Sequence, residues 1–522
     1  MPVVEFGEYA PDISSHLSQY SDSIKNVVPR GDGYGPFNAL SAFTSAVGVS
    51  SAVACRGLFF ARKNDGSIKV FAGSENSILT LDNTTGTWTN ISKIGTASLL
   101  LTDGLSFLLL ASGSDRLDMT TGTGSAIYSS LSSSDQWQFA QFNRYVIAVQ
   151  RNELPQVFDL INSSAFDDLG GSPPQASYVS IVNRFVVLSG ILAPDVYNIQ
   201  WSDLNGITTW DGSGQSDTQT FADGGAVRGV AGGEYGVIFQ DGSIRRMTYA
   251  PGSPYIFSID RVSDGDGLFA PYSLVSSGDK IFFCSPQGFK MMAPGSFPVS
   301  IGKEKIDRTF FADVDTANLQ LMIGAADPQT TRVYWAYKSA NGETGKFDTI
   351  LIYDWSLQKW ARVEVSGDYI SSLSRPGITL EGVDAAYGSN IDTISLTSLD
   401  AISASSLVSL AGVDQDHKVG FFIGDALEAT LETPELSGDG KRIFVRGVRP
   451  VSNAATVYGS VSARETEQAT AVYSDETSVN AVGSCPQRVS TRYSRAKLRI
   501  PAGTAWTYAR GIEPDFTIEG DR

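Results

Sequence analysis

The sequence predicts an all-β protein whose main part is a β-propeller of six to seven blades. Three observations carry this prediction. A turn-and-strand sequence recurs at a spacing near 40 residues, a strand–turn–aromatic pattern follows it in several units, and the 52 glycines among 522 residues favour frequent turns. Periods of this size, made of short strands, are typical of propeller blades.

The recurring sequence is clearest at residues 142–147 and 182–187, which read FNRYVI and VNRFVV and lie 40 residues apart. In each copy an Asn, which tolerates positive φ in a turn, precedes β-branched and aromatic residues that fit a half-buried strand. Comparable markers stand at residues 65–66, 103–104, 143, 183, 233–234, 278–279 and near 331, between 38 and about 52 residues apart. We therefore expect the propeller over residues 46–365.

The second pattern is a strand, an Asp-led turn and an aromatic residue six or seven positions later. It occurs at Asp82 and Trp88, Asp159 and Phe166, Asp203 and Trp210, and Asp354 and Trp360. An Asp stabilises its own turn through side-chain hydrogen bonds, and the aromatic ring fills the space between neighbouring sheets. This predicts core positions, and not a sugar-binding platform, for Trp88, Trp201, Trp210, Trp355 and Trp360.

The rest of the chain divides into three parts. Residues 1–45 lack strand periodicity and are expected to form an extended arm, with a short helix from residue 10 to 26 and an irregular Pro- and Gly-rich stretch at 29–36. Residues 366–415 are rich in Ser, Asp and Gly and predict a crossing loop or an excursion. Residues 416–522 regain alternation and predict a small C-terminal β-sandwich or barrel.

Charge and targeting features narrow the function classes. The 56 acidic residues exceed the 39 basic ones, giving a net charge of −17, which argues against a surface that grips DNA. The most apolar stretch, residues 94–112, is interrupted by a Thr-Asp-Gly sequence at 102–104 and predicts a hairpin, not a membrane span. Residues 1–9 carry no cationic region typical of a signal peptide. Cys55, Cys284 and Cys485 are widely spaced and predict buried thiols in a reducing compartment.

The sequence contains little that predicts catalysis. A Ser-His-Asp triad would have to use His16 or His417, and we interpret His417 as a solvated turn residue. The G-x-S-x-G, GxxxxGK[ST], HExxH and helix-opening GxGxxG motifs are absent. Asp264–Gly267 and Arg30–Asp32 are interpreted as plain turns, without a calcium or adhesion role. We therefore expect no enzyme, and assign no catalytic, cofactor-binding or metal-binding residue.

Three segments together resemble a known class of protein. They are residues 26–36 (NVVPRGDGYGP), residues 420–432, which contain GFFIG and ATLE, and residues 492–506, which contain RYSR and IPAGTAW. The chain resembles the tail nozzle, or hub, proteins of short-tailed bacteriophages and prophages. The resemblance implies a structural subunit of the virion tail, assembled in the bacterial cytoplasm into a hexameric ring. Such a ring extends the DNA-ejection channel below the portal and adaptor and anchors fibres or spikes.

A channel of this kind lets DNA pass without binding it. An acidic lumen repels the phosphate backbone, whereas a cationic lumen would hold it, so we expect lumen-facing charges to be mainly Asp and Glu. Two alternatives remain open: a tail propeller that binds or cleaves glycans, and a kelch-like protein-interaction module. The strand–turn–aromatic pattern resembles kelch hairpins, although the double glycine of kelch repeats is absent.

Overall fold

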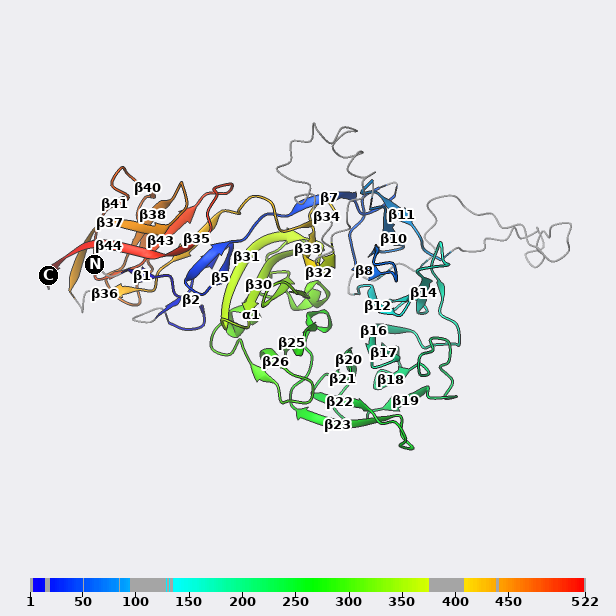
Figure 1. Cartoon of the computed structure of the whole chain (residues 1–522). Coiled ribbons are helices and arrows are strands. Elements are labelled where there is room, and N and C mark those ends of the chain that lie inside the picture. The colour runs from blue at the N-terminus through cyan, green and yellow to red at the C-terminus, as the bar shows by residue number, and fades with distance from the viewer. Residues whose placement is uncertain are drawn as a thin grey trace.

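The computed structural model shows a ring of β-sheets with a β-sandwich attached to one side (Figure 1). It describes residues 3–14, 19–49, 51–83, 85–93, 128, 131, 135–374, 408–437 and 441–520. Both ends of the chain lie on the sandwich side of the molecule. The predicted all-β class is confirmed, and so is the propeller with its separate C-terminal β domain.

The ring is a seven-bladed propeller in which every blade is a four-stranded antiparallel sheet. Blades one to three comprise β8 (Leu58–Arg62), β9 (Ile68–Gly73), β10 (Ile78–Leu81) and β11 (Trp88–Asn90); β12 (Gln138–Phe142), β13 (Tyr145–Val149), β14 (Gln156–Asp159) and β15 (Asp167–Asp168); and β16 (Ala176–Val182), β17 (Phe185–Ile191), β18 (Asn198–Trp201) and β19 (Asp217–Thr220).

The next three blades follow the same plan. They comprise β20 (Val227–Ala231), β21 (Gly236–Gln240), β22 (Ser243–Tyr249) and β23 (Phe257–Asp264); β24 (Val275–Ser277), β25 (Lys280–Ser285), β26 (Gly288–Met292) and β27 (Val299–Ser300); and β28 (Ile323–Asp327), β29 (Arg332–Tyr337), β30 (Phe347–Asp354) and β31 (Lys359–Gly367). Three short helices lie between blades: η1 (Pro271–Ser273), α1 (Asp307–Asp313) and η2 (Thr316–Leu321).

Blade seven joins two distant parts of the chain. Its strands are β32 (Tyr369–Ser374), β33 (Val408–Val413) and β34 (Lys418–Phe421), and β7 (Ser41–Ala46) from the N-terminal region completes it as the edge strand. The backbone N–H of Val419 donates to Thr44 Oγ1 at 3.0 Å, and that of Val47 to the His417 carbonyl at 2.7 Å. The ring is therefore closed by backbone pairing between strands more than 370 residues apart.

A separate hydrophobic cluster fills each blade interface, which shows that the ring is complete. Phe71 packs against Phe158 between blades one and two, with ring centroids 5.5 Å apart. Phe239 and Phe283 approach to 4.9 Å between blades four and five. At the last interface, Leu373 and other residues of blade seven pack against blade one. Burying both faces of every blade in this way stabilises sheets that could not bury them alone.

The centre of the ring is filled at one end. Just before β12, the backbone N–H of Gln136 donates to Tyr272 Oη, in the segment before β24, at 3.1 Å. Gln136 Nε2 also donates to the carbonyl of Gln320, before β28, at 3.1 Å. Tyr178 of β16 packs edge-on against Tyr272, with centroids 5.7 Å apart. Because these segments belong to non-adjacent blades, their contacts cross the axis of the propeller.

The described turn markers fall where the sequence analysis expects them. Each opens the first hairpin of a blade: residues 65–66 between β8 and β9, Asn143 between β12 and β13, and Asn183 between β16 and β17. Both Asn residues have positive φ, 55° and 53°. The marker at 103–104 and the predicted hairpin at 94–112 lie outside the described residues.

The boundaries of the propeller differ from the predicted range 46–365. Residues 366–415, predicted as a loop or excursion, include β32 and β33; residues 375–407 lie outside the described part. The Ser- and Gly-rich composition concealed these strands, because small residues also fit the crowded inner positions of a blade. Gly412 of β33 shows this, since a Cβ there would stand 2.9 Å from the Leu40 side chain.

The sandwich consists of two six-stranded sheets with two small accessory pairings. One sheet contains β1 (Val4–Glu5), β5 (Val27–Arg30), β6 (Gly33–Pro36), β37 (Arg442–Ser452), β41 (Cys485–Thr491) and β44 (Ala509–Gly520). The other contains β4 (Ile24–Lys25), β35 (Ala429–Glu432), β38 (Tyr458–Ala463), β39 (Val472–Tyr473), β40 (Thr477–Ser478) and β43 (Ala496–Ile500). The pairings are β2 (Glu8–Tyr9) with β3 (Tyr20–Ser21), and β36 (Leu436–Ser437) with β42 (Tyr493–Ser494).

The N-terminal region is not the strand-free arm that was predicted for residues 1–45. β1, β4, β5 and β6 belong to the sandwich, and β3 and β4 lie where the helix over residues 10–26 was expected. The stretch 29–36 forms the β5–β6 hairpin despite its two prolines. β5 is an edge strand, where proline is tolerated because an edge N–H needs no partner.

One close approach links blades one and two. Trp137 is fully buried and its Nε1 donates to the Ser74 carbonyl at 2.8 Å. Its ring lies against Gly73, where a Cβ would stand 2.4 Å from Trp137 Cδ1. A side chain at position 73 would therefore displace the indole from its pocket.

We expect Gly73→Ala to destabilise the ring by about 2 kcal/mol or more, because overpacking a full core forces side chains and backbone to shift. Guanidinium denaturation followed by tryptophan fluorescence measures this change. Gly31→Ala is the control, because a Cβ there meets nothing within 4 Å. Equal midpoints for the two variants would contradict the packing argument.

Candidate functional site

His417 is not the solvated turn residue that was predicted. It does lie in a turn, with φ of 63°, but its side chain is half-buried and Nδ1 lies 2.5 Å from Oδ2 of Asp368. The same oxygen accepts the backbone N–H of Cys55 at 3.0 Å. Asp368 precedes β32 and Cys55 precedes β8, so the three residues tie blade seven to blade one.

This Cys–His–Asp grouping does not form a nucleophilic site. Asp368 is bound to the main chain of Cys55, while the Sγ donates to the Gly57 carbonyl at 3.3 Å. Burial raises the pKa of the Cys55 thiol to about 12, which keeps it protonated at neutral pH. A nucleophilic cysteine needs a lowered pKa and access to substrate. The grouping is a structural contact of the ring closure.

The other residues singled out in the sequence also have structural positions. Trp88, Trp201, Trp210 and Trp360 are buried, and Trp355 is half-buried against Phe282, which confirms the predicted core role. The three cysteines are buried and free, as predicted. Within the described residues, no group of three His, Cys, Asp or Glu side chains could hold a metal ion. His16 lies outside those residues.

The two segments interpreted as turns contain turn or bend residues in the structure. In Asp264–Gly267, Gly265 has φ of 86°, Asp266 pairs with Lys290 and accepts the Ser263 hydroxyl at 2.7 Å. Arg30–Asp32 forms the tight turn between β5 and β6. Neither turn presents a set of unpaired carboxylates.

The candidate functional site is the junction between the propeller and the sandwich. We use this name for the β5–β6 hairpin, β31 of blade six, the start of β35 and the loop at residues 501–508. Parts of residues 26–36, 420–432 and 492–506 lie together here: Asn26 Nδ2 donates to the Glu428 carbonyl at 2.8 Å, and the Gly503 N–H donates to the Ala426 carbonyl at 2.9 Å. Ile24 pairs with Leu431, and Ala429 with Ile500, so the arm, β35 and β43 lie side by side in one sheet.

Asn26 is the central residue of the junction. Its backbone is left-handed, with φ of 58°, and its N–H donates to the Arg362 carbonyl of β31 at 2.9 Å. Its side chain accepts the backbone N–H of Glu364 at 2.8 Å and donates to the Glu428 carbonyl at 2.8 Å. One side chain thus bonds to the propeller through its oxygen and to the sandwich through its nitrogen.

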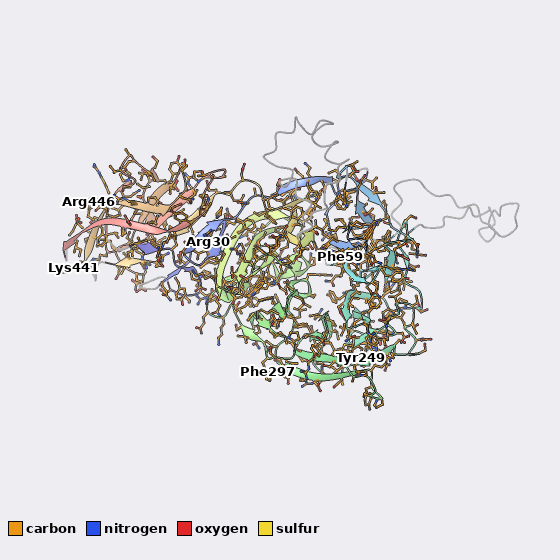
Figure 2. All side chains as sticks on the ribbon, in the orientation of Figure 1. Arg30, Phe59, Tyr249, Phe297, Lys441 and Arg446 are labelled. Atoms are coloured by element: carbon orange, nitrogen blue, oxygen red, sulfur yellow. The ribbon has the colours of Figure 1, made fainter. Side chains whose placement is uncertain are left out.

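Three cations fasten the β5–β6 hairpin further. Arg30, which lies between the ring and the sandwich in Figure 2, donates to the Thr507 carbonyl at 3.1 Å. From the propeller side, Arg332 donates to the Pro29 carbonyl at 2.9 Å and Lys359 to the Arg30 carbonyl at 3.2 Å. Hydrogen bonds from charged donors are stronger than those from neutral donors. The hairpin thus receives such bonds from the propeller, through Arg332 and Lys359, and itself donates one to the sandwich, through Arg30.

The arm also caps a propeller helix. Asp12 accepts the backbone N–H of Arg308 at 2.7 Å and of Thr309 at 2.9 Å, both in the first turn of α1. The residue at the N-cap position, Ile306, provides no side-chain cap. Asp12 thus supplies from the arm the carboxylate that a helix N-terminus favours.

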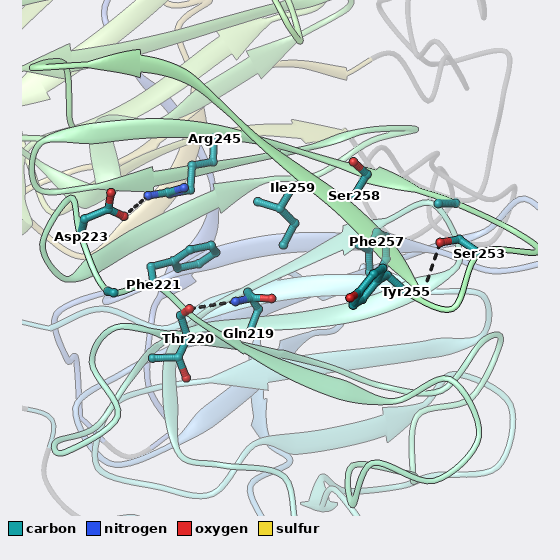
Figure 3. A pocket seen from close by; sticks show the side chains of 12 residues that line it. Gln219, Thr220, Phe221, Asp223, Arg245, Ser253, Tyr255, Phe257, Ser258 and Ile259 are labelled. Atoms are coloured by element: carbon teal, nitrogen blue, oxygen red, sulfur yellow. Dashed lines mark hydrogen bonds and ion pairs between the residues drawn. The ribbon is translucent and has the colours of Figure 1, made fainter.

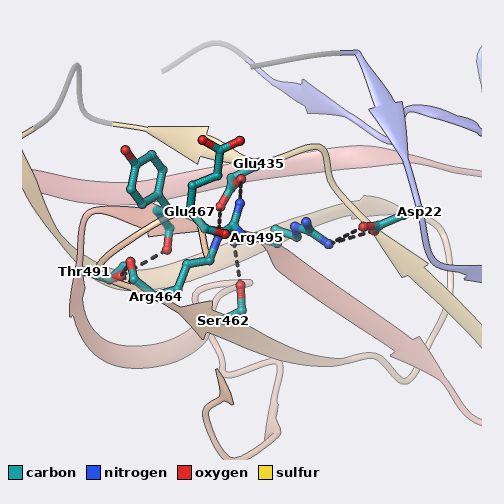
Figure 4. Close-up of polar contacts among 8 residues, drawn as sticks. Asp22, Glu435, Ser462, Arg464, Glu467, Thr491 and Arg495 are labelled. Atoms are coloured by element: carbon teal, nitrogen blue, oxygen red, sulfur yellow. Dashed lines mark hydrogen bonds and ion pairs between the residues drawn. The ribbon is translucent and has the colours of Figure 1, made fainter. Parts of the chain in front are cut away.

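Inside the sandwich, ion pairs hold the C-terminal motif RYSR (Figure 4). Arg495 donates to both carboxylate oxygens of Asp22 in the arm, at 2.8 and 2.7 Å. Arg464 forms a two-point pair with the buried Glu435, and its guanidinium lies 5.6 Å from the Tyr493 ring. The motif therefore joins the N-terminal region to the rest of the sandwich.

The arrangement is a set of hydrogen bonds and ion pairs that joins the sandwich to the propeller. The sequence analysis identified the segments of the junction through the resemblance, and it missed Asp12, Asn26 and Asp368. One sequence signal for Asn26 was available. It stands directly before the apolar residues Val27 and Val28, and Asn is among the few residues that accept the positive φ of a turn before a strand.

Comparisons with known proteins add likenesses of fold only. No protein-family model matches the chain, and no curated protein matches it. Similar solved structures include the computationally designed Ika8 protein, at 13% identity and a TM-score of 0.33, covering 73% of this chain and 98% of that one. Others are YCF48 bound to D1 peptide, at 12% and 0.33 over 67% and 92%, and dihydro-heme d1 dehydrogenase NirN, at 12% and 0.33 over 64% and 60%.

Among the described residues, no helix has the length and apolar content needed to cross a bilayer.

We expect Asn26→Ala to loosen the junction by about 3 kcal/mol, through two lost hydrogen bonds and a strained left-handed backbone. Asn26→Gly removes the strain and should cost about 2 kcal/mol. Hydrogen exchange of the β5 and β6 amides should accelerate by about 100-fold in the Ala variant. Asn143→Gly, at an exposed hairpin turn with the same backbone, is the control and should leave these amides unchanged.

A buried carboxylate lies beside the docked arm. Asp307 of α1 is 7% exposed, and its Oδ1 accepts the Phe289 N–H at 3.1 Å. Its carboxylate lies against Gly288 and Gly302, where a Cβ would come within 2.0 Å of an oxygen. Burial raises the pKa of Asp307 to about 6, with Asp12 adding a smaller rise and Lys290 opposing it.

This shift predicts a pH dependence of stability. The pKa of an Asp in the unfolded chain is about 3.9, so the folded protein binds the Asp307 proton more tightly than the unfolded chain does. The protonated carboxyl therefore contributes stability that is fully present below about pH 4 and is lost as the pH rises through 6. Asp307→Asn should remove this loss and raise stability by about 2 kcal/mol at pH 7.5, with little change at pH 4. Thermal unfolding of both proteins from pH 4 to 8 measures it, and parallel curves would refute the assignment.

Proposed function

We propose that the chain is a structural subunit of the tail nozzle of a short-tailed bacteriophage. Several copies form a ring, of six subunits, that continues the DNA-ejection channel below the portal and adaptor and carries fibres or spikes. The observation that supports this proposal most is that parts of the three segments that resemble nozzle proteins, at Asn26, at residues 426–429 and at residues 500–503, contact one another at the junction. Segments that resemble a structural subunit are expected to form a structural contact of this kind.

The junction suits a subunit that carries mechanical load. Hydrogen bonds of Asn26, Arg332 and Lys359, together with the cap from Asp12, hold the sandwich against blade six and α1. The hydrophobic core runs through the contact without a break, from Trp360 of blade six to Leu431 of the sandwich. A tail component must keep its shape while DNA passes, and a continuous core gives the two domains a fixed relation.

The DNA path in this proposal lies between subunits. The contacts of Gln136 with Tyr272 and Gln320 fill one end of the propeller axis, so a single propeller is not the conduit. A lumen formed by several copies would carry the charge of the surfaces turned toward it. The net charge of −17 supports an acidic lumen that repels the phosphate backbone.

We expect purified full-length protein to form particles of one size, with a mass about six times that of the single chain. Mass photometry measures the mass, and negative-stain images of the same sample should show rings. At about 150 mM salt the rings should not retain duplex DNA in a gel-shift assay. Monomers at every concentration up to about 50 μM, or particles that bind DNA tightly, would contradict the proposal.

A further inference from the structure

A pocket of about 460 Å³ opens between blades three and four, away from the junction. One side is β19 with the turn that follows it, and the other is the hairpin of β22 and β23. Figure 3 shows Tyr255 and Phe257 at one end and the Asp223–Arg245 pair at the other. The volume lies within the range of roughly 300–1,000 Å³ that is typical of small-molecule sites.

The aromatic end of the pocket offers a stacking surface. Tyr255, at the tip of the hairpin, is 75% exposed. Its backbone N–H donates to Ser253 Oγ at 3.2 Å, which fixes the turn that carries it. Phe257, two residues further along, is buried, with its ring 5.1 Å from Trp201 and 4.9 Å from Phe185. The hairpin that carries the exposed Tyr255 is thus anchored in the blade by Phe257.

The polar end is built from a held ion pair. Arg245 pairs with Asp223, and its Nε donates to Gln240 Oε1 at 2.8 Å. The guanidinium lies 4.9 Å from the Phe221 ring, and Arg261 also pairs with Asp223. These contacts fix the orientation of the Asp223 carboxylate and of the Arg245 guanidinium. Their opposite charges largely cancel.

Between the two ends the lining is polar and open to solvent. Gln219, Thr220 and Ser258 are exposed, and all four residues of β19 face water. Side-chain amides and hydroxyls of this kind both donate and accept hydrogen bonds. A ligand here would meet one apolar face and a row of donors and acceptors.

We propose that this pocket binds a neutral carbohydrate of about two sugar rings. The C–H face of one ring stacks on Tyr255, and hydroxyls of the next bond to Asp223, Arg245 and Gln219. A phosphate or sulfate ligand is disfavoured because the Asp223 carboxylate pairs with both Arg245 and Arg261. A purely apolar ligand would remove the ion pair from water without hydrogen bonding to it. This inference goes beyond the proposed nozzle role and does not depend on ring formation.

Saturation-transfer difference NMR on the full-length protein tests the proposal with maltose, cellobiose, lactose and N,N′-diacetylchitobiose as probes. We expect saturable binding of at least one disaccharide with Kd below about 10 mM. Tyr255→Ala and Gln219→Ala should each weaken it by about tenfold or more. Tyr235→Ala is the matched control, since Tyr235 is a 42% exposed tyrosine outside the pocket, and it should bind as the parent does.

Asp223→Asn gives a second test that separates recognition from folding. Its circular-dichroism spectrum and unfolding midpoint are compared with those of Gln219→Ala, a fully surface-exposed change that leaves the ion pairs intact. Weakened binding in both folded variants supports the site. Absence of saturable binding for all four sugars, or equal loss in Tyr235→Ala, overturns it. Either outcome leaves the mass-photometry result of the nozzle proposal unaffected.

Discussion

The closure of the propeller by β7 is the constraint on which the rest of the structure depends. Blades one to six each take their four strands from one continuous segment. Blade seven takes three strands from residues 369–421, and its fourth strand, β7, comes from the N-terminal region. Without β7, β34 would expose an unpaired edge and the cluster between blades seven and one would lose Phe43 and Val47. Because this pairing joins the two ends of the propeller sequence, it links blade seven to the N-terminal region and closes the ring.

The same N-terminal region also builds the sandwich. Before it reaches β7, the chain has already supplied β1, β4, β5 and β6, and its Asp12 has capped α1. Ring closure and docking of the sandwich are therefore coupled through about 40 consecutive residues. A displacement at the junction would pull directly on the edge strand of blade seven. This coupling is the physical basis for treating the chain as one stiff building block.

Polar groups inside this block serve structure. Asp368 joins His417 and the main chain of Cys55 where the ring closes, and Gln136 crosses the axis to bond with Tyr272. Buried polar groups must be paired, and a pairing with strict geometry selects one arrangement of the blades over alternatives that are equally apolar. The pocket between blades three and four differs, because its exposed Tyr255 and its ion pair face solvent.

The sequence by itself determined the all-β class, the blade hairpins at Asn143 and Asn183, and the burial of tryptophans such as Trp360, because these follow from turn chemistry and local alternation. It did not determine that β32 and β33 complete a blade, that residues 29–36 form a hairpin, or that Asn26 bonds two domains. The alternation of apolar and polar residues along a strand predicts which side chains face inward, but it does not predict which strand lies beside it. That choice was made only by tertiary pairing, since partners of β7, β6 and Asn26 lie hundreds of residues away.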